Sequence, residues 1–215
     1  KELQGNERAG SEQARSFRAR ADLFEIACAW FERRMAAEPA ALAYATDARA
    51  WETVTAQKAR LGFTGRGTQQ ERADLLGDLR LYGHDPESPA AVAILGLRGG
   101  VAAWGKRWGV DVQSNWVDQD RIWGMLDFPR LVYPHIERGN KVVYFSARNL
   151  EYERMDDGRQ ETGRLISRSE KPKMHNLARV LVGERRVYFN HAYRRNSKSV
   201  VVVEGPADGV TLGQW

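Results

Sequence analysis

The sequence predicts an α+β fold in which a mostly helical first half is followed by a small, basic antiparallel sheet. Through much of residues 21–125 the apolar residues recur at three- and four-residue steps, as on the buried face of a helix. Beyond that point RLVYPHI and KVVYFSAR, both rich in β-branched and aromatic residues, are separated by ERGN. Two such runs around a short polar turn are typical of a β-hairpin.

The first helices are delimited by a proline and by glycines. Residues 1–20 are polar, and we expect them to lead into a helix that begins near Ala21. Pro39 interrupts this helix, because proline lacks a backbone N–H, and a short helix resumes over AALAYATD. Another helix is expected in residues 47–67, ended by Gly62 or by the following glycine-rich loop.

Two more helices complete the first half, and a strand and a helix are expected at the end of the chain. The helix in residues 68–83 is expected to be capped by Thr68, with Leu75, Leu76, Leu79 and Leu81 as its apolar set. Residues 88–110 are expected to be helical with a break at Gly99–Gly100. We expect residues 126–199 to form the basic α/β part. Residues 200–215, VVVVEGPADGVTLGQW, predict a buried strand, a turn and a helix that begins near Ala207.

The composition excludes some classes of protein. A hydrophobic fraction of 42% and a charged fraction of 28% are ordinary for a globular chain. No apolar run is long enough for a membrane helix, and the N-terminal residues lack the apolar core of a signal peptide, so we expect a cytoplasmic protein. The single cysteine, Cys28, excludes a disulfide within the chain and a zinc site built from several cysteines. Its apolar neighbours predict a buried thiol.

Positive charge is concentrated in one segment. Lysine and arginine balance aspartate and glutamate over residues 1–125, whereas residues 164–198 hold ten basic residues against Glu170 and Glu184. Aromatic residues are interleaved there, namely Tyr188, Phe189 and Tyr193. This pattern favours a polyanion as partner. A solvated basic face is the alternative, and both remain open.

Most motifs of known chemistry are missing from the sequence. It contains no phosphate-binding P-loop, no serine-nucleophile elbow and no HExxH or CxxC motif, and its four histidines are scattered. Asp118 and Asp120 could bind Mg²⁺, but we expect them to cap a turn. Core and loop packing is the simplest role for the tryptophans of this region, namely Trp104, Trp108, Trp116 and Trp123.

The acidic pair near the end of the chain is a better candidate. Glu204 follows the four valines, and Asp208 lies one helical turn later. Carboxylates at the carboxyl edge of an α/β sheet suit Mg²⁺ and phosphoryl transfer. The alternative is that both side chains cap the helix that begins there. The residues themselves leave these two roles open.

VVVVEGPADGVTL resembles the opening motif of the TOPRIM domain of bacterial DnaG-type DNA primases, with Glu204, Gly205 and Asp208 matching. Four upstream segments are similar to primase motifs in the same order. The helical segment FERRMAAEPAALAYATDARAWETVTAQKARLGFTG comes first, and the hairpin PRLVYPHIERGNKVVYFSAR follows, matching at Arg130, Pro134, Gly139 and Arg148. KPKMHN then matches at Pro172, Lys173 and Asn176, and GERRVYFNHAY matches at Tyr188.

The chain also departs from the family pattern. Ser146 and Ala147 replace a Gly-Gly pair of the hairpin, and Pro206 replaces the usual Tyr. This suggests a divergent branch carried by a phage, plasmid or other mobile element. The remaining TOPRIM acids of the family would lie beyond Trp215, so we expect the chain to be a fragment ending in the first strand and helix of a TOPRIM domain.

The resemblance implies a function for the intact protein, which is the synthesis of short RNA primers on single-stranded DNA by Mg²⁺- or Mn²⁺-dependent nucleotidyl transfer. It implies Glu204 and Asp208 as catalytic residues, with Glu204 as a metal ligand. The implied partners are the template strand, the RNA primer–DNA hybrid, nucleoside triphosphates and, as a candidate, a replicative helicase. The nucleic-acid-binding residues implied by the motifs and the basic segment are Arg130, Lys141, Arg148, Lys171, Lys173, Asn176, Arg185 and Arg186.

Other functions and roles remain open. The chain could be a non-catalytic single-stranded nucleic-acid-binding module with a degenerate TOPRIM start, or another TOPRIM enzyme of repair or plasmid maintenance. Arg130 could pair with Asp127, and Asn176 could cap a helix beginning at Leu177.

Overall fold

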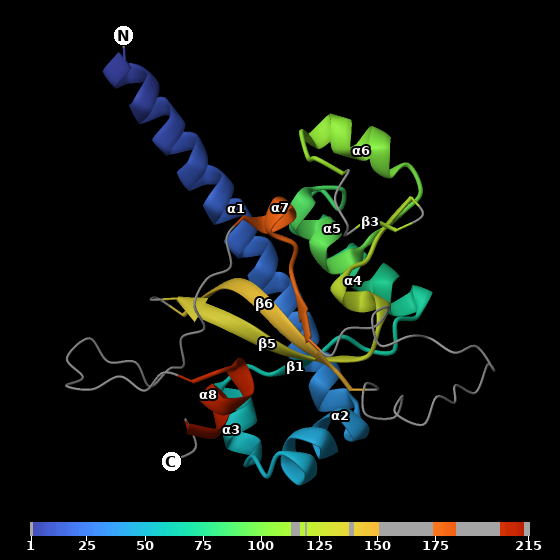
Figure 1. The fold of residues 1–215 in the computed structure, drawn as a ribbon. Coiled ribbons are helices and arrows are strands. Elements are labelled where there is room, and N and C mark those ends of the chain that lie inside the picture. Colours follow the sequence, from blue (N-terminus) through green and yellow to red (C-terminus); the bar gives the residue numbers. More distant parts are fainter. Residues whose placement is uncertain are drawn as a thin grey trace.

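The computed structural model describes residues 2–112, 117–118, 120–137, 140–150, 174–183 and 203–212, with the backbone alone at residues 2–17 and 117–118. A four-stranded antiparallel sheet with the order β1-β5-β6-β7 lies at its centre (Figure 1). The two long strands, β5 (Arg130–Glu137) and β6 (Lys141–Asn149), confirm the predicted hairpin. The outer strands are β1 (Gly62–Phe63) and β7 (Met174–Asn176).

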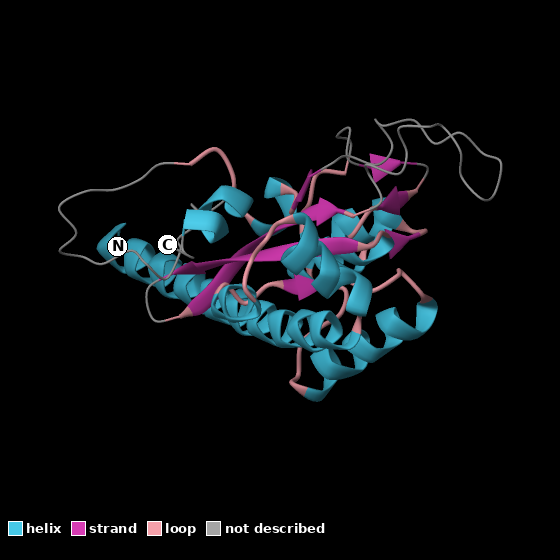
Figure 2. Cartoon of the chain, turned by 90° about the horizontal axis from the view of Figure 1, so that it is seen from below, coloured by secondary structure: helices cyan, strands magenta, loops and turns pink. Residues whose placement is uncertain are grey.

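Helix α1 (Glu2–Ala37) crosses one face of this sheet, and its N-terminal part extends beyond the sheet (Figures 1 and 2). The helix was expected to begin near Ala21, where its apolar periodicity starts, but it already includes most of the polar residues before that point. Phe24 and Phe31 of α1 each meet Phe145 of β6 edge to face, with ring centroids 5.3 and 5.5 Å apart. Cys28 lies in the same core with 1% of its surface exposed, and burial raises the pKa of its thiol. The prediction of a buried thiol is confirmed.

The other face of the sheet is covered by short helices. Successive residues of a strand point to opposite faces of the sheet. Leu131 and Tyr133 of β5 therefore lie on the face opposite to the middle of α1, where they pack against the short helices. Trp51 meets the Tyr133 ring edge to face at 6.4 Å, and its indole Nε1 donates a 2.9 Å hydrogen bond to Thr211. The elements of this layer are α2 (Pro39–Ala43), the π-helix η1 (Tyr44–Ala48), α3 (Thr53–Lys58) and α8 (Pro206–Leu212).

The predicted interruption at Pro39 is confirmed, because α2 starts there as a separate helix. The helix predicted to begin near Ala207 is also confirmed, since α8 starts at Pro206. The helix expected in residues 47–67 is shorter than predicted, because Gly62 enters strand β1 and pairs with Val132. The predicted strand of valines at residues 200–202 lies outside the described residues.

Helix α4 (Gln69–Leu81) is capped by Thr68, as predicted. The Thr68 hydroxyl accepts a hydrogen bond from the backbone N–H of Glu71, and the Glu71 carboxylate accepts one from the backbone N–H of Thr68 in return. Leu75 and Leu79 are fully buried in the core. Leu81 was expected there too, but it lies in the last turn with 79% of its surface exposed, so this prediction is wrong.

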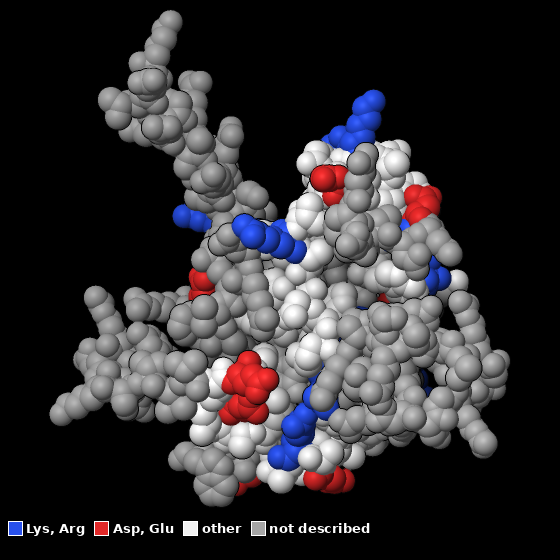
Figure 3. Space-filling view, viewed as in Figure 1, with Lys and Arg blue, Asp and Glu red and all other residues white. Residues whose placement is uncertain are grey.

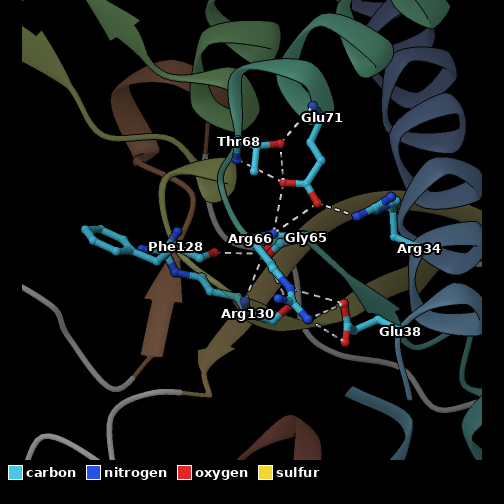
Figure 4. Close-up of polar contacts among 9 residues, drawn as sticks. Arg34, Glu38, Gly65, Arg66, Thr68, Glu71, Phe128 and Arg130 are labelled. Atoms are coloured by element: carbon cyan, nitrogen blue, oxygen red, sulfur yellow. Dashed lines mark hydrogen bonds and ion pairs between the residues drawn. The ribbon is translucent and has the colours of Figure 1, made fainter. Parts of the chain in front are cut away.

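The same Glu71 carboxylate anchors the loop that leads from β1 to α4 (Figure 4). It accepts a 2.9 Å hydrogen bond from the backbone N–H of Arg66 and forms an ion pair with Arg34 of α1. Burial opposes ionisation of this carboxyl, but the hydrogen bonds from Thr68 and Arg66 hold its pKa below the ordinary value. The Arg66 side chain extends outward to Glu38, whose hydrogen bond raises the pKa of Arg66.

A smaller sheet, three α-helices and the short 3₁₀-helix η2 (Met125–Asp127) complete the described fold. Helix α5 (Pro89–Leu95) is fully buried over its last six residues, and α7 (Arg179–Val182) packs on it. Helix α6 (Val101–Trp108) follows the predicted break at Gly99–Gly100. The connecting residues Leu97 and Arg98 form a strand, β2, which was not predicted. It belongs to a sheet with the order β2-β4-β3, in which the other strands are β4 (Arg121–Ile122) and β3 (Val117–Asp118).

Two-residue strands such as β1 to β4 carry no alternating pattern, and their pairing with distant segments is what defines them. Asp120 lies between β3 and β4, and its carboxylate accepts hydrogen bonds of 2.7 Å from the backbone N–H groups of Gly100 and Val101 at the start of α6. The expectation that Asp120 caps a turn is therefore confirmed.

None of the helices in the described ranges is long and apolar enough to span a membrane.

Candidate nucleic-acid interface

Two arginines converge on one tyrosine beside the end of strand β6. Tyr44 opens the π-helix η1, and the guanidinium carbons of Arg49 and Arg148 lie 5.6 and 6.0 Å from the centre of its ring. Arg49 Nε also donates a 3.2 Å hydrogen bond to the Tyr44 hydroxyl. All three side chains are half-buried. Because a guanidinium within about 6 Å of an aromatic ring is attracted to its face, the ring holds both cations in place.

A chain of polar groups leads from the interior to the surface of the same sheet face. His135 of β5 and Ser146 of β6 are both fully buried, and His135 Nε2 lies 2.9 Å from Ser146 Oγ. The Ser146 hydroxyl donates a 2.8 Å hydrogen bond to Oδ1 of Asn176, which is exposed on β7. Since Oδ1 accepts this bond, the Nδ2 group of Asn176 can serve as a donor to a ligand.

Arg148 and Asn176 are close neighbours on this face. Ser146 pairs with Asn176 and Arg148 pairs with Met174, so the arginine and the asparagine are diagonal neighbours of adjacent strands. Such diagonal neighbours lie roughly 7–8 Å apart, with their Cβ atoms somewhat closer. Lys141 is exposed at the opposite end of β6, seven residues from Arg148, which corresponds to roughly 20 Å along a strand. The structure thus groups Arg148 with Asn176 but not with Lys141.

Arg130 is an interior residue, which corrects the prediction that it contacts nucleic acid. Its side chain is 1% exposed, and Nη1 donates hydrogen bonds to the carbonyl oxygens of Gly124 (3.0 Å) and Met125 (2.7 Å). Its backbone N–H donates to the hydroxyl of Thr64, and its guanidinium lies against the ring of Phe128 (Figure 4). Burial lowers the pKa of Arg130 to about 10. The side chain points inward because the carbonyl groups that bind it lie beneath the start of β5.

The two acidic residues near the end of the chain, Glu204 and Asp208, are both exposed. Glu204 precedes α8 and Asp208 lies in its first turn. Figure 3 shows acidic side chains over α8, with basic side chains beside them toward α2. Asp208 Oδ2 accepts a 3.1 Å hydrogen bond from the backbone N–H of Gly205, so Asp208 does cap the start of α8, as the alternative role required.

The donor set present in the described residues does not make up a metal site. Carboxylate oxygens are the ligands that Mg²⁺ prefers, and Glu204 offers an exposed carboxylate. However, the described part of the chain holds no group of three or more His, Cys, Asp or Glu side chains that could share a metal ion. Glu204 and Asp208 alone therefore do not fit the metal site that the resemblance implies.

Four of the expected nucleic-acid-binding residues lie outside the described residues, namely Lys171, Lys173, Arg185 and Arg186. Conversely, Tyr44, Arg49 and His135 were not among the residues predicted for the site. Ser146 was noticed as a departure from Gly-Gly, and the structure gives it a role as the donor to Asn176. Tyr44 and Arg49 lie in a segment that resembles an early helical motif of primases, which could have marked them as candidates. Their contact with Arg148 could not be predicted, because it depends on tertiary packing.

The fold and the site define a mixed α+β chain with arginine, tyrosine and amide groups gathered on one face of an antiparallel sheet. No protein-family model matches the sequence, and no curated protein sequence matches it. Among solved structures, the chain is similar to the RNA polymerase domain of the primase DnaG of Mycobacterium tuberculosis, in three structures.

One of these structures contains a double-stranded DNA oligomer with a 6-nucleotide overhang. Its TM-score is 0.48 at 19% identity, over 76% of this chain and 39% of that chain. Another is the same domain alone, with a TM-score of 0.45 at 19% identity over 79% of this chain and 41% of that chain. This chain therefore spans about two fifths of the length of the chains that it matches.

Proposed function

We propose that the chain binds single-stranded nucleic acid on the sheet face that carries Arg148. The observation that carries this proposal is the convergence of Arg49 and Arg148 on the ring of Tyr44, next to the amide of Asn176. Guanidinium groups bind backbone phosphates, and aromatic rings stack on bases of any sequence. Such a combination suits a single strand held without sequence preference.

We further propose that this binding surface belongs to the template-binding part of a DnaG-type primase. Support comes from the order of the five sequence motifs and from the hairpin and helix α8, which form where those motifs lie. In the intact protein the expected activity is RNA primer synthesis from nucleoside triphosphates, with Mg²⁺ or Mn²⁺ held by Glu204 and by groups outside the described residues. A replicative helicase is a candidate partner of that protein.

The binding proposal is tested by titrating a fluorescein-labelled oligothymidylate with the protein at several salt concentrations and measuring fluorescence anisotropy. With roughly four to six phosphate contacts, the slope of log K against log salt is expected to be about −3 to −4, since each contact contributes ~0.7. Arg148→Ala and Arg49→Ala should each reduce the magnitude of the slope by ~0.7. Tyr44→Leu should weaken binding at every salt concentration with a smaller change in slope.

Arg33→Ala is a matched control, because Arg33 is an exposed arginine of α1 that pairs with Asp78, away from this surface. It should leave both affinity and slope unchanged. Binding that does not depend on salt, or that is equally sensitive to Arg33 and Arg148, would contradict the proposed interface.

A non-catalytic binding module is the second candidate, because the described residues hold no cluster of three metal-binding side chains. Both candidates predict that the 215-residue chain binds a strand but does not extend a primer. Primer extension with Mg²⁺ and nucleoside triphosphates by this chain alone would contradict this shared expectation, and it would also exclude the non-catalytic candidate.

A further inference from the structure

The exposed amide of Asn176 is supported from beneath by two buried side chains of the neighbouring strands. In the register of β5 and β6, His135 and Ser146 are diagonal neighbours on one face of the sheet. On its other side, Ser146 pairs with Asn176 of β7. His135 and Ser146 both have 0% of their surface exposed, whereas Asn176 is exposed. The three polar groups therefore form one line from the interior to the surface.

The direction of the hydrogen bonds along this line is determined by a single proton. A serine hydroxyl donates one hydrogen bond, and that of Ser146 goes to Oδ1 of Asn176 at 2.8 Å. The 2.9 Å contact between His135 Nε2 and the same hydroxyl must then be a hydrogen bond that Nε2–H donates. His135 therefore carries a proton on Nε2 in this arrangement.

The opposite arrangement would present a different group at the surface. If Nε2 of His135 carried no proton, the Ser146 hydroxyl would donate to it, and the Asn176 amide could bond to the hydroxyl oxygen only through Nδ2. The amide would then be turned over, with Oδ1 outward as an acceptor in place of Nδ2 as a donor. The position of the proton on His135 thus decides which ligand groups Asn176 can bind.

The His135 ring is held in place by aromatic packing. It meets the ring of Tyr144 edge to face, with centroids 5.0 Å apart and planes inclined by 68°. Tyr144 is itself 2% exposed, and its hydroxyl donates a 2.8 Å hydrogen bond to the carbonyl oxygen of Leu177. This packing keeps Nε2 toward Ser146, since turning the ring over would place a C–H group there.

The outward end of Asn176 lies next to a second donor. Within the described part of the chain, the Asn176 side chain makes its hydrogen bond with Ser146, which leaves the Nδ2 group for a ligand. Arg148 is the diagonal neighbour of Asn176 across β6 and β7, and a guanidinium group only donates. Two donors side by side suit a ligand with several acceptor oxygens, such as a backbone phosphate, and do not accept a hydrogen bond from a base amino group.

We infer that His135 and Ser146 are positioning residues that keep the Nδ2 group of Asn176 outward, so that it binds a phosphate oxygen of the strand and not a base. This inference rests on the proposed function and adds to it the atom that Asn176 recognises and the buried residue that selects it. A glycine at position 146, as in the primase pattern, has no side chain to relay the hydrogen bond. The arrangement therefore requires the serine of this chain.

The position of the proton is measured in the wild-type chain, without any substitution in the core. Long-range ¹H–¹⁵N NMR spectra of the histidine rings distinguish a nitrogen that carries a proton from one that does not. The spectrum of His135→Gln assigns the His135 signals among the four histidines of the chain. We expect a proton on Nε2 of His135, and a bare Nε2 would overturn the inference.

Two labelled oligonucleotides test what Asn176 binds. Oligothymidylate and oligodeoxycytidylate present the same phosphates, but their bases differ, since cytosine carries an amino donor where thymine carries an acceptor oxygen. Asn176→Ala is expected to weaken binding of both strands by the same factor, about tenfold, as for a hydrogen bond to a charged group. Arg33→Ala should affect neither strand. A loss that differs between the two strands would show that the amide contacts a base, and the inference would be wrong.

Two substitutions of His135 test the relay itself. Glutamine keeps an N–H group near the position of Nε2 and should preserve the affinity, whereas leucine cannot donate. In His135→Leu the Ser146 hydroxyl is free to rotate and the Asn176 amide occupies both orientations, so the affinity should fall about twofold for both strands. The same substitution should have no effect in the Asn176→Ala chain. Equal losses in the two backgrounds would mean that His135 does not act through Asn176, which would overturn the inference.

The outcomes separate this inference from the proposed function. If Arg148→Ala weakens binding and Asn176→Ala does not, the inference is overturned and the proposed interface stands. If neither substitution weakens binding, both are contradicted. Circular dichroism melting checks that each variant is folded, and if a His135 variant does not fold, the NMR measurement on the wild type and the exposed substitution Asn176→Ala decide the outcome.

Discussion

The hydroxyl of Ser146 lies 2.8 Å from Oδ1 of Asn176 and joins β6 to β7 at the surface that we propose binds nucleic acid. Ser146 stands where the primase pattern that the hairpin resembles has a glycine, and its hydroxyl contacts both His135 and Asn176, which a glycine could not do.

Ser146→Ala is expected to destabilise the fold by about 1–3 kcal/mol, because it leaves the buried His135 without this partner. Asn176→Ala removes an exposed partner and should cost less, about 0.5–1.5 kcal/mol. Urea denaturation measures both values. Equal stability of Ser146→Ala and the wild type would contradict the role of this hydroxyl.

Gly62→Ala and Gly77→Ala are expected to change stability in opposite directions. A Cβ at Gly62 would overlap the Phe31 side chain and lie 3.0 Å from the Phe31 carbonyl carbon, so α1 would have to move off the sheet. Such overpacking typically costs about 1–3 kcal/mol. Gly77 is exposed in α4 with no atom within 4 Å of the added carbon, so alanine there should stabilise by about 0.5–1 kcal/mol. Thermal melting of both variants checks this contrast.

Glu71→Gln is expected to destabilise the chain by about 1–3 kcal/mol at neutral pH, because the carboxylate anchors the start of α4 and the preceding loop. The folded-state pKa of Glu71 is depressed. Its contribution is therefore present above the unfolded-state pKa and is lost as the pH falls through the folded-state value.

The difference in unfolding free energy between the wild type and Glu71→Gln should consequently shrink on acidification. Glu87→Gln is the control, since Glu87 is an exposed partner of Arg107 at the surface. A difference that is constant with pH would contradict the depressed pKa of Glu71.

His175 is expected to remain neutral in the folded chain at physiological pH. Burial lowers its pKa to about 3, and the nearby charge of Arg130 adds to this effect. The unfolded chain binds a proton near pH 6.5 while the folded chain does not, so stability should fall as the pH drops below that value. Because the residue keeps part of its surface exposed, we expect a loss of about 1–2 kcal/mol between roughly pH 7 and pH 5.

His175→Gln should remove this component of the pH dependence. NMR titration of the imidazole provides a direct measurement, in which no change is expected above about pH 5. A ring that titrates near pH 6.5 would contradict the prediction.

Local sequence was sufficient where one segment contains all the interactions that define a feature. The hairpin of β5 and β6 follows from two alternating runs around a short turn. The cap at Thr68 needs only Glu71 three residues later, and Cys28 is buried because it lies on the apolar side of its own helix. Such features depend on neighbours within a few residues, so their patterns are visible in the chain.

Tertiary structure decided the direction of individual side chains and the meeting of distant ones. Arg130 was expected to bind nucleic acid, but the carbonyl groups of Gly124 and Met125 hold it in the interior. Arg148 reaches the ring of Tyr44 only because η1 packs beside the end of β6. The sequence alone determined most of the helices, the long hairpin and the kind of chemistry, basic and aromatic, but not the short strands β1 to β4 and β7. The places where these groups converge depend on strand register and helix packing, which are set by contacts between segments far apart in the chain.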